Sequence, residues 1–308
     1  MRDTMTSTAQ TLRFDGLHLC RGSYPLEIHP DEIHVWLVAS DVWGNSAAPD
    51  RNVLSAGERA KLSRLRLESD RRSYRVAHET LRQLLSAYCP SVEPKAWQFE
   101  YGTAGRPDLK ASESGLTFNL SHTCGQAALA FARDCQLGVD VETVIADTDL
   151  DLAESICTTD ELRALRALPQ VDQPRRFTQL WTLKEAYLKA IGKGLSQSPQ
   201  SIGFRFLESV EISHQIMEPL DAPNANFRFC SSQVSATQSL AVAWGTPEAR
   251  PKRRLKIVRL APDQLAAVMQ GCFPGHDQDT RALCSPSIST AVARANFAKK
   301  GDPCTMSA

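Results

Sequence analysis

Two acidic residues, Asp140 and Glu142, stand one position apart in the stretch "GVDVE" (residues 138–142). If this stretch is a β-strand, both carboxylates project from one face while Val139 and Val141 face the core. Two carboxylates that lie close together repel each other unless a cation or a basic group stands between them. Oxygen ligands of this kind suit Mg2+, which takes a few carboxylates together with waters and phosphate oxygens. Taken alone, the pattern favours the alternative interpretation, an ordinary half-exposed strand with a solvated acidic face.

A second charged group lies in "WTLKEAYLKAIGKGL" (residues 181–195), where the apolar spacing predicts a helix over residues 175–192. Lys184 falls inside the apolar arc of that helix, so its ammonium must reach past the core or meet an anion. Glu185 and Lys189 are four residues apart and therefore face each other along the edge of the arc. The alternative interpretation is a Glu–Lys pair that only stabilises the helix.

Ser121 and His122 end the predicted strand "LTFNLSHT" (residues 116–123). A hydroxyl and an imidazole both suit phosphate oxygens, and the imidazole can become charged near neutral pH. Adjacent strand residues point to opposite faces, so the two do not form a nucleophile and base pair. A merely polar strand end is the alternative.

Basic residues gather in two places that could meet phosphate groups. The helical region over residues 53–88 is the most basic part of the chain, and most of its cations are expected on a solvated face. A "GRP" turn adds Arg106. The basic residues of the helical region are Arg59, Lys61, Arg64, Arg66, Arg71, Arg72 and Arg75.

The elements that must position these groups alternate along the chain. Hydrophobic periodicity and turn residues predict strands at 32–40, 116–123, 126–132 and 136–144, and a strand with a Gly-Pro turn within 97–109. They also predict one or two helices over 53–88 and helices at 151–156, 158–168 and 175–192. Three further strands, within "SIGFRFL", "NFRFCSS" and "SLAVAWG", are expected to form one antiparallel sheet. The element order of the first half thus recurs in the second half, without a residue-level repeat. We expect poor order in about the last 25 residues, and little effect on activity from truncation after about residue 250.

Size and charge exclude several classes of function. The chain has 308 residues, with 35 basic and 35 acidic side chains, so no bulk attraction to nucleic acid or to a membrane is expected. No apolar run is long enough for a membrane span, and the first residues lack the apolar core of a signal peptide, which predicts a cytoplasmic protein. The nine cysteines are scattered, which favours reduced thiols over disulfides or a zinc site.

In this order and spacing, "FNLSHT", "LGVDVE" and "LWTLKEAYLKAIGKGL" resemble the three motifs of the Sfp-type 4′-phosphopantetheinyl transferases. The resemblance covers about residues 30 to 245. It implies an α+β fold, the 4′-phosphopantetheinyl transferase fold, as a pseudo-dimer of two similar α+β halves in one chain. On this basis we expect an N-terminal half at 1–125, a C-terminal half at 126–249 and a partly disordered C-terminal extension at 250–308.

The resemblance also implies roles for individual residues. It makes Asp140, Glu142 and Glu185 ligands of Mg2+, with Glu185 and Lys189 as the catalytic residues. It assigns coenzyme A binding to Ser121, His122, Arg106, Arg72, Lys184 and Lys189. The basic helix departs from the common family spelling and reads "DRRSYRVAHETLR", so the choice among Arg71, Arg72 and Arg75 stays open.

The activity implied by the resemblance is transfer of the 4′-phosphopantetheine group from coenzyme A to a serine of an apo acyl or peptidyl carrier protein, with release of 3′,5′-ADP. The corresponding enzyme is a phosphopantetheinyl transferase of the holo-[acyl-carrier-protein] synthase type, serving fatty acid, polyketide or nonribosomal peptide biosynthesis. We expect a monomer with coenzyme A and the carrier as partners, Mg2+ as cofactor, and no nucleic acid or membrane partner. The alternatives are a catalytically silent coenzyme A-binding scaffold and a Mg2+-dependent phosphohydrolase.

Overall fold

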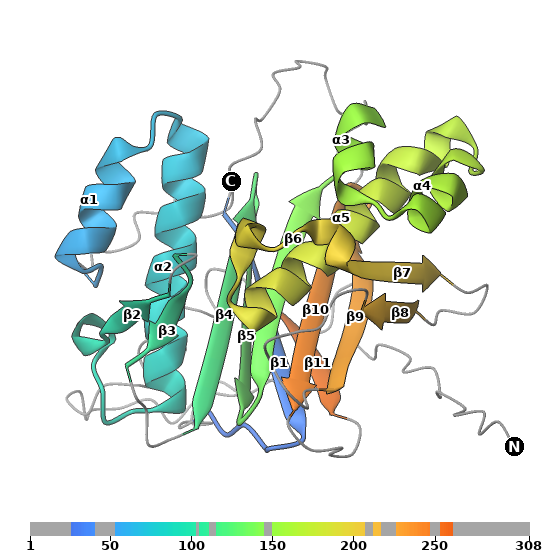
Figure 1. Ribbon diagram of the computed structural model, residues 1–308. Coiled ribbons are helices and arrows are strands. Elements are labelled where there is room, and N and C mark those ends of the chain that lie inside the picture. Colours follow the sequence, from blue (N-terminus) through green and yellow to red (C-terminus); the bar gives the residue numbers. More distant parts are fainter. Residues whose placement is uncertain are drawn as a thin grey trace, which may run out of the picture. The chain divides into compact units, whose positions relative to one another are not determined.

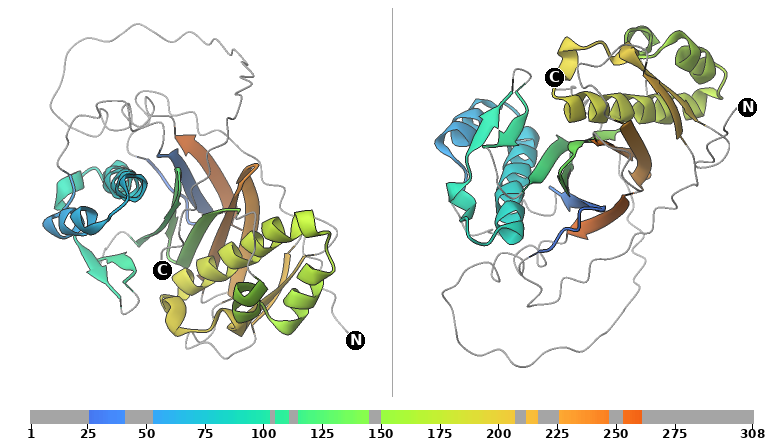
Figure 2. Two further views of the ribbon diagram at one scale, coloured as in Figure 1. Left: turned by 90° about the horizontal axis from the view of Figure 1, so that it is seen from above. Right: turned by 60° about the horizontal axis from the view of Figure 1, so that its bottom comes forward.

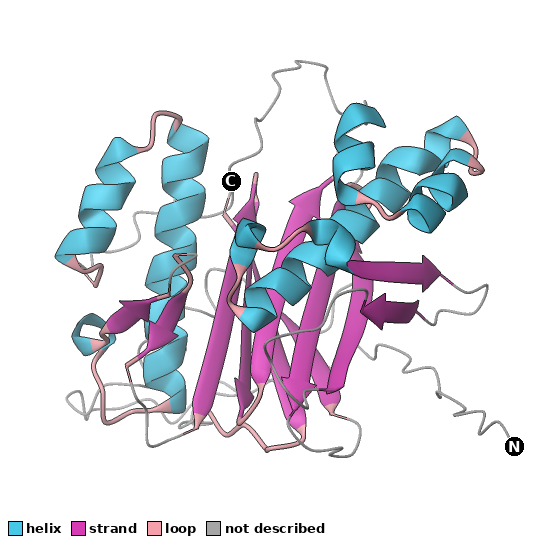
Figure 3. Cartoon of the chain, viewed as in Figure 1, coloured by secondary structure: helices cyan, strands magenta, loops and turns pink. Residues whose placement is uncertain are grey.

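The structure is a computed structural model that describes residues 26–40, 53–102, 105–110, 115–144, 150–206, 212–216, 226–246 and 253–260. These ranges all lie within one compact unit, Met1–Cys272. Figure 1 labels the helices and strands, and Figure 3 colours them by type. Helices and antiparallel strands both contribute, so the predicted α+β class is confirmed.

Within these ranges, no helix combines the length and the apolar character that crossing a membrane would require. The cysteines in the same ranges are all free thiols: Cys89, Cys124, Cys135, Cys157 and Cys230.

The first sheet has four strands in the order β11-β1-β5-β4. Its strands are β1 (Glu32–Ala39), β4 (Leu116–Thr123), β5 (Gln126–Arg133) and β11 (Arg254–Leu260). β11 runs parallel to β1, while β5 is antiparallel to both of its neighbours. Strand alternation divides β1 between two cores, because Trp36 and Val38 belong to one buried cluster and Val35 and Leu37 to another.

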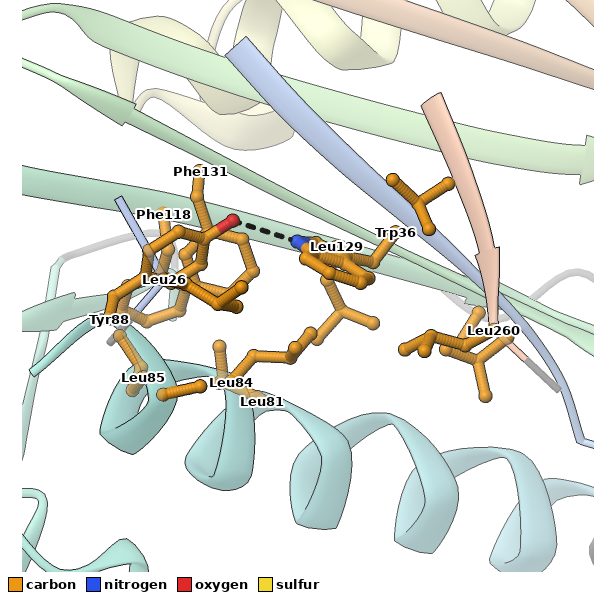
Figure 4. Packing of buried hydrophobic residues seen from close by; sticks show 14 of the residues in the cluster. Leu26, Trp36, Leu81, Leu84, Leu85, Tyr88, Phe118, Leu129, Phe131 and Leu260 are labelled. Carbon is orange, nitrogen blue, oxygen red and sulfur yellow. Dashed lines mark hydrogen bonds between the residues drawn. The ribbon is translucent and has the colours of Figure 1, made fainter. Parts of the chain in front are cut away.

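Helix α2 (Glu68–Tyr88) covers one face of this sheet. Its Leu81, Leu84 and Leu85 lie one turn apart and are fully buried against the sheet. Figure 4 shows this packing, including the hydrogen bond that the Trp36 indole donates to the Tyr88 hydroxyl at 3.0 Å. The short helix α1 (Ala56–Arg64) precedes α2, and the two-stranded hairpin of β2 (Phe99–Tyr101) and β3 (Pro107–Leu109) follows it.

The second sheet has the strand order β6-β10-β9. Its strands are β6 (Gln136–Thr143), β9 (Asn226–Ser235) and β10 (Gln238–Thr246), all antiparallel to their neighbours. Helix α5 (Gln173–Ile191) packs on one face, after the helices α3 (Leu150–Ile156) and α4 (Thr159–Arg166). The opposite faces of the two sheets share a third buried cluster, so the strands lie between α2 and α5, as Figure 2 shows.

Helix α5 approaches β6 closely because Gly138 has no side chain. A Cβ atom at this position would lie 1.9 Å from the carbonyl oxygen of Ala186. Gly192 ends the helix in the left-handed conformation, with φ of 70°, and its N–H is directed back to the last turn. The contact at Gly138 brings the C-terminal half of α5 onto the same face of β6 that carries Asp140 and Glu142.

Three sequence expectations differ from the structure. The strand β7 (Ile202–Phe206) pairs with β8 (Ile212–Ile216) in a separate two-stranded sheet, so the prediction that it joins β9 and β10 is wrong. The segment after residue 250 contributes β11, which no pattern had indicated. The boundary expected at residues 125/126 falls between β4 and β5, which are hydrogen-bonded neighbours in one sheet.

Candidate active site

Three polar side chains from three elements meet where β4, β6 and α5 come together. Lys189 Nζ lies 2.7 Å from Asp140 Oδ1 and donates a hydrogen bond to Ser121 Oγ at 3.0 Å. Ser121 Oγ in turn donates to the same Asp140 oxygen at 2.8 Å. The side chain of Lys189 keeps 27% of its surface exposed while that of Asp140 keeps 3%. The ammonium of Lys189 therefore contacts a buried carboxylate while its side chain stays accessible to solvent.

The edges of the two sheets are joined beside this cluster. Asn119 of β4 accepts a hydrogen bond from the Val139 backbone N–H through its side-chain oxygen, at 2.8 Å. Four residues further along β4, Thr123 donates a hydrogen bond to Glu142 Oε2 at 3.2 Å. The junction thus holds both Asp140 and Glu142 against residues of β4.

Glu142 and Glu185 are carboxyl groups that resist ionisation. Burial raises the pKa of Glu142 to about 7, and the charge of Asp140 adds to this, with a smaller contribution from Glu185. Burial likewise raises the pKa of Glu185 to about 7, followed by the charge of Asp140, while Lys189 opposes the change. The three predicted metal ligands are therefore close enough to repel one another, as paired carboxylates without a cation between them do.

Oxygen atoms that suit a divalent cation are present at this cluster. Asp140 Oδ2 is buried and has no hydrogen-bond partner among the described residues. An unpaired buried carboxylate oxygen beside two carboxyls of raised pKa has the chemistry of a hard-cation site. Across the described ranges, however, no three His, Cys, Asp or Glu side chains form a ready group for a metal ion. The donor set fits Mg2+, with further oxygens needed from water or a phosphate ligand.

His122 points away from this cluster, toward α2. Its ring meets Tyr74 edge to face at 6.3 Å, and Tyr74 stacks on His78 at 4.0 Å. Burial lowers the pKa of His122 to about 4, and the positive charges of His78, Lys189 and Lys61 add to this. The neutral imidazole can donate or accept a hydrogen bond, and an anion bound here would be stabilised by the surrounding cations.

The three candidate arginines of α2 differ in what they contact. Arg71 donates to Glu68 at 2.9 Å and to the Leu65 carbonyl at 3.0 Å. Arg75 donates to Glu79 at 2.8 Å. Arg72 is half-buried and makes no hydrogen bond or ion pair within the described part of the chain. Arg72 is thus the one of the three whose guanidinium is not engaged there.

Arg106 is directed to the end of α5. Its guanidinium donates to the carbonyls of Lys189 and Ala190, at 2.6 and 3.1 Å, and pairs with Asp108 at 2.9 Å. A cation at a helix C-terminus is favourable because the last carbonyls carry partial negative charge. The geometry fits an anchor for the helix end and does not support the predicted contact with the nucleotide end of coenzyme A.

Lys184 does not face the cluster at all. Its side chain is fully buried and its ammonium lies 2.8 Å from Glu161 Oε2. The predicted contact of Lys184 with phosphate groups is therefore contradicted by its placement. Of the two alternatives that the apolar arc left open, reaching past the core or meeting an anion, the structure has the second, and the anion is a carboxylate of α4.

The sequence patterns missed several side chains of the site. Thr123 directly follows the Ser–His pair, and strand alternation places it on the face of Ser121, which was an available signal. Lys61, Tyr74 and His78 come near His122 only through the packing of α1 and α2 on the sheet. No spacing rule indicates that contact.

Comparison with known proteins gives consistent matches. A family model described as the 4′-phosphopantetheinyl transferase superfamily matches residues 136–244. The 4′-phosphopantetheinyl transferase HetI of Nostoc sp. is 34% identical over 197 residues, which cover 63% of this chain and 79% of that protein. A 4′-phosphopantetheinyl transferase of Bacillus subtilis is 29% identical over 174 residues, covering 53% of this chain and 76% of that protein.

A solved structure also matches part of the chain. It is a holo-(acyl-carrier-protein) synthase from Bacillus anthracis in complex with CoA (3′,5′-ADP), 18% identical and covering 36% of this chain and 94% of that chain, with a TM-score of 0.30. A TM-score of this size is too low to support a conclusion on fold or function.

Proposed function

Since this chain belongs to the 4′-phosphopantetheinyl transferase superfamily, we infer that it transfers the 4′-phosphopantetheine group from coenzyme A to a serine of an apo carrier protein and releases 3′,5′-ADP. The observation that carries this inference is the meeting of Asp140, Ser121 and Lys189 at the junction of the two sheets. Two carboxyls of raised pKa lie beside it. The site thus offers a cation, a proton acceptor and oxygen ligands in one place.

The reaction joins the carrier serine oxygen to the β-phosphorus of coenzyme A and breaks the bond from that phosphorus to the oxygen of 3′,5′-ADP. The nucleophile belongs to the carrier, so the chain needs a proton acceptor and a group that neutralises the leaving oxygen. Glu185 is our candidate acceptor, because its carboxyl group lies beside Asp140 and one turn of α5 before Lys189. Lys189 supplies the positive charge for the leaving phosphate oxygen.

Asp140, Glu142 and Glu185 are the proposed ligands of Mg2+. When bound, the cation would neutralise charge on the diphosphate of coenzyme A as a Lewis acid. In the structure, Lys189 and Ser121 already satisfy one oxygen of Asp140, which leaves Oδ2 as the open ligand.

Coenzyme A is a polyanion, and the proposed contacts surround the end of β4. Ser121 and His122 project to opposite faces of this strand, so they would meet different phosphate groups. Lys61 and Lys189 increase the positive potential beside His122. The unengaged guanidinium of Arg72 supports it as the contributing arginine of α2, in preference to Arg71 and Arg75.

We also propose that the fold consists of two similar α+β halves in one chain. The order of the strands in the two sheets supports this proposal. Apart from β11, the two sheets share one strand order: the first strand along the chain lies beside the third, and the second lies beyond the third, as β1-β5-β4 and as β6-β10-β9. Each half then consists of a strand, a helical segment and a hairpin. We therefore propose a division between β5 and β6 in preference to residues 125/126, and the strand order supports this proposal.

The deciding experiment is one incubation of the protein with coenzyme A, Mg2+ and an apo carrier protein, read by intact mass and by release of 3′,5′-ADP. We expect a phosphopantetheine adduct on the carrier serine. Comparing acyl and peptidyl carriers tests the narrower proposal of a holo-[acyl-carrier-protein] synthase. Release of 3′,5′-ADP without an adduct on any of several unrelated carriers would support hydrolysis, and no product of either kind would support a silent binder.

A further inference from the structure

The ammonium of Lys184 is fully used inside the protein. The side chain is 0% exposed, and Nζ contacts Glu161 Oε2 at 2.8 Å, the Ile202 carbonyl at 2.7 Å and the Pro199 carbonyl at 3.0 Å. A lysine ammonium has three N–H donors. All three have acceptors from the chain itself, so none is available for a phosphate ligand.

Glu161 is engaged just as completely. Its Oε1 accepts the Phe204 backbone N–H at 2.6 Å, and its Oε2 accepts the Thr158 backbone N–H at 2.7 Å as well as Lys184. The bond to Thr158 is half of a capping box that begins α4. A buried carboxylate with this many partners is costly to disturb, because removing the lysine would leave the charge unpaired.

The ion pair therefore fastens α5 to two other elements. Glu161 belongs to α4 and holds the backbone of β7 through Phe204, while Lys184 holds the start of β7 through Ile202. Lys184 directly precedes Glu185 in the helix, and Lys189 follows about one turn later. Fixing Lys184 on one side of α5 thus fixes the direction in which Glu185 and Lys189 leave the helix on the side of β6.

We infer that Lys184 is a positioning residue for the transfer reaction, acting through its buried pair with Glu161, and not a contact of the substrate. This inference rests on the proposed function for the reaction but on the structure alone for the pair. Without the pair, the turn of α5 that carries Glu185 is free to shift relative to Asp140. A displacement of about 1 Å at a reacting group can lower the rate on the order of 100-fold.

The test compares Lys184→Met, Glu161→Gln and the double variant in the full-length chain. Asp160→Asn is the matched control, because Asp160 also forms an ion pair on α4, with Arg163, but both side chains are more than 70% exposed. Glu161→Gln keeps an oxygen acceptor and the shape of the side chain, so it remains informative if Lys184→Met folds poorly. Rates are measured per folded molecule, at a temperature where circular dichroism shows each variant folded.

We expect both single variants to lower kcat on the order of 10- to 100-fold with the KM for coenzyme A changed by less than about twofold. The double variant should be no slower than the worse single variant, because the two residues act as one unit. Amide hydrogen exchange, measured without ligand, should rise in residues 181–191 and 202–206 together. The control should match the unsubstituted protein in every measurement.

A rise in the KM for coenzyme A in Lys184→Met, with normal kinetics in Glu161→Gln, would overturn the inference and make Lys184 a substrate contact. Lower thermal midpoints with normal kcat per folded molecule would overturn it too, because the pair would then serve stability only. If the unsubstituted protein transfers nothing, the proposed function fails. The exchange measurement still decides whether the pair couples α5 to β7.

Discussion

Glu142 and Glu185 are the residues whose chemistry depends most on their surroundings. Each has a pKa raised to about 7, with burial as the largest cause and the charge of Asp140 next. Near neutral pH, each group can therefore exchange a proton at little cost. A cation bound between the carboxylates would hold all of them ionised, because metal ligands must be deprotonated.

The raised pKa values of Glu142 and Glu185 should make the free energy of unfolding depend on pH. The folded pKa of about 7 exceeds the unfolded value of 4.5, so between these values the native state holds a proton that the unfolded state has released. Stability is thus lost as pH rises through this window. Glu142→Gln, which mimics the protonated form, should match the native stability at pH 5 and exceed it on the order of 1–3 kcal/mol at pH 8.

Urea unfolding at the two pH values, with a chelator present, measures this difference. Buried histidines such as His122, with a lowered pKa, change stability in the opposite sense below about pH 6.5. They are common to both proteins, so their effect cancels in the comparison. An equal difference between Glu142→Gln and the native protein at pH 5 and pH 8 would show that Glu142 ionises normally.

Activity should depend on Glu185 more than on any exposed carboxylate. Glu185→Gln keeps the size of the side chain but removes both the base and a proposed metal ligand, so we expect kcat to fall roughly 10²- to 10⁴-fold. Glu93→Gln is the control, since Glu93 is exposed. Transfer to the carrier, followed by intact mass, gives the rate. Unchanged turnover in a folded Glu185→Gln protein would contradict the assignment of the base and the metal ligand.

At this scale the sequence predicted the residues of the cluster better than their partners. Strand alternation placed Asp140 and Glu142 on one face, and the structure brings Ser121 and Lys189, which the motifs also indicated, into contact with Asp140. The place of Lys184 in the apolar arc predicted that its ammonium must reach past the core or meet an anion. The spacing could not show that the anion is Glu161, because this contact depends on how α4 packs on α5. The contact of Arg106 with the end of α5 likewise depends on tertiary packing, so the sequence spacing could not predict it.

Helix α5 positions Glu185 and Lys189 in the site, and its close packing on β6 depends on Gly138. Gly138→Ala would bring Cβ to 1.9 Å from the Ala186 carbonyl oxygen, which is backbone and cannot turn aside. We expect a loss of about 1–3 kcal/mol in the free energy of unfolding. The rate of transfer should fall as well, because a shift of α5 away from β6 in this variant would move Glu185 and Lys189 away from Asp140.

Gly57→Ala is the matched control, because a Cβ there has open space around it. Since alanine favours a helix over glycine, the stability of this variant should be unchanged or raised by up to about 1 kcal/mol. Thermal unfolding and transfer rate are measured for both variants. A Gly138→Ala protein with native stability and native rate would show that α5 does not depend on this contact.

Most elements followed from local patterns, while their pairing did not. The helices and strands around the three motifs lie within a few residues of their predicted bounds, since periodicity and turn residues define them locally. The strand β7 pairs with β8, the next strand along the chain, and not with β9 or β10. The pairing of β11 with β1 joins segments from opposite ends of the described chain and is non-local. The short basic segment "RLKIVRL" has no local pattern from which its pairing with β1 could be predicted.

On the scale of the whole molecule, the chain after residue 250 completes the first sheet. In β11, Ile257, Val258 and Leu260 are buried in the cores on both sides of the sheet. Lys256 and Arg254 lie 2.8 and 3.0 Å from Glu32, whose side chain is only 7% exposed. The segment is therefore part of the folded unit although it lies beyond the three motifs.

A chain that ends at residue 250 should consequently fold poorly, contrary to the expectation from the motifs alone. Burial of three apolar side chains contributes about 5–9 kcal/mol, a large share of the roughly 5–15 kcal/mol that stabilises a typical domain. Removing β11 also leaves Glu32 buried without its two basic partners and exposes the edge of β1 to aggregation. The matched control ends at residue 272, the boundary of the first compact unit, and keeps β11. Soluble yield, thermal midpoint and carrier modification are compared; a chain ending at residue 250 that equals the control in all three would show that β11 adds nothing to the folded enzyme.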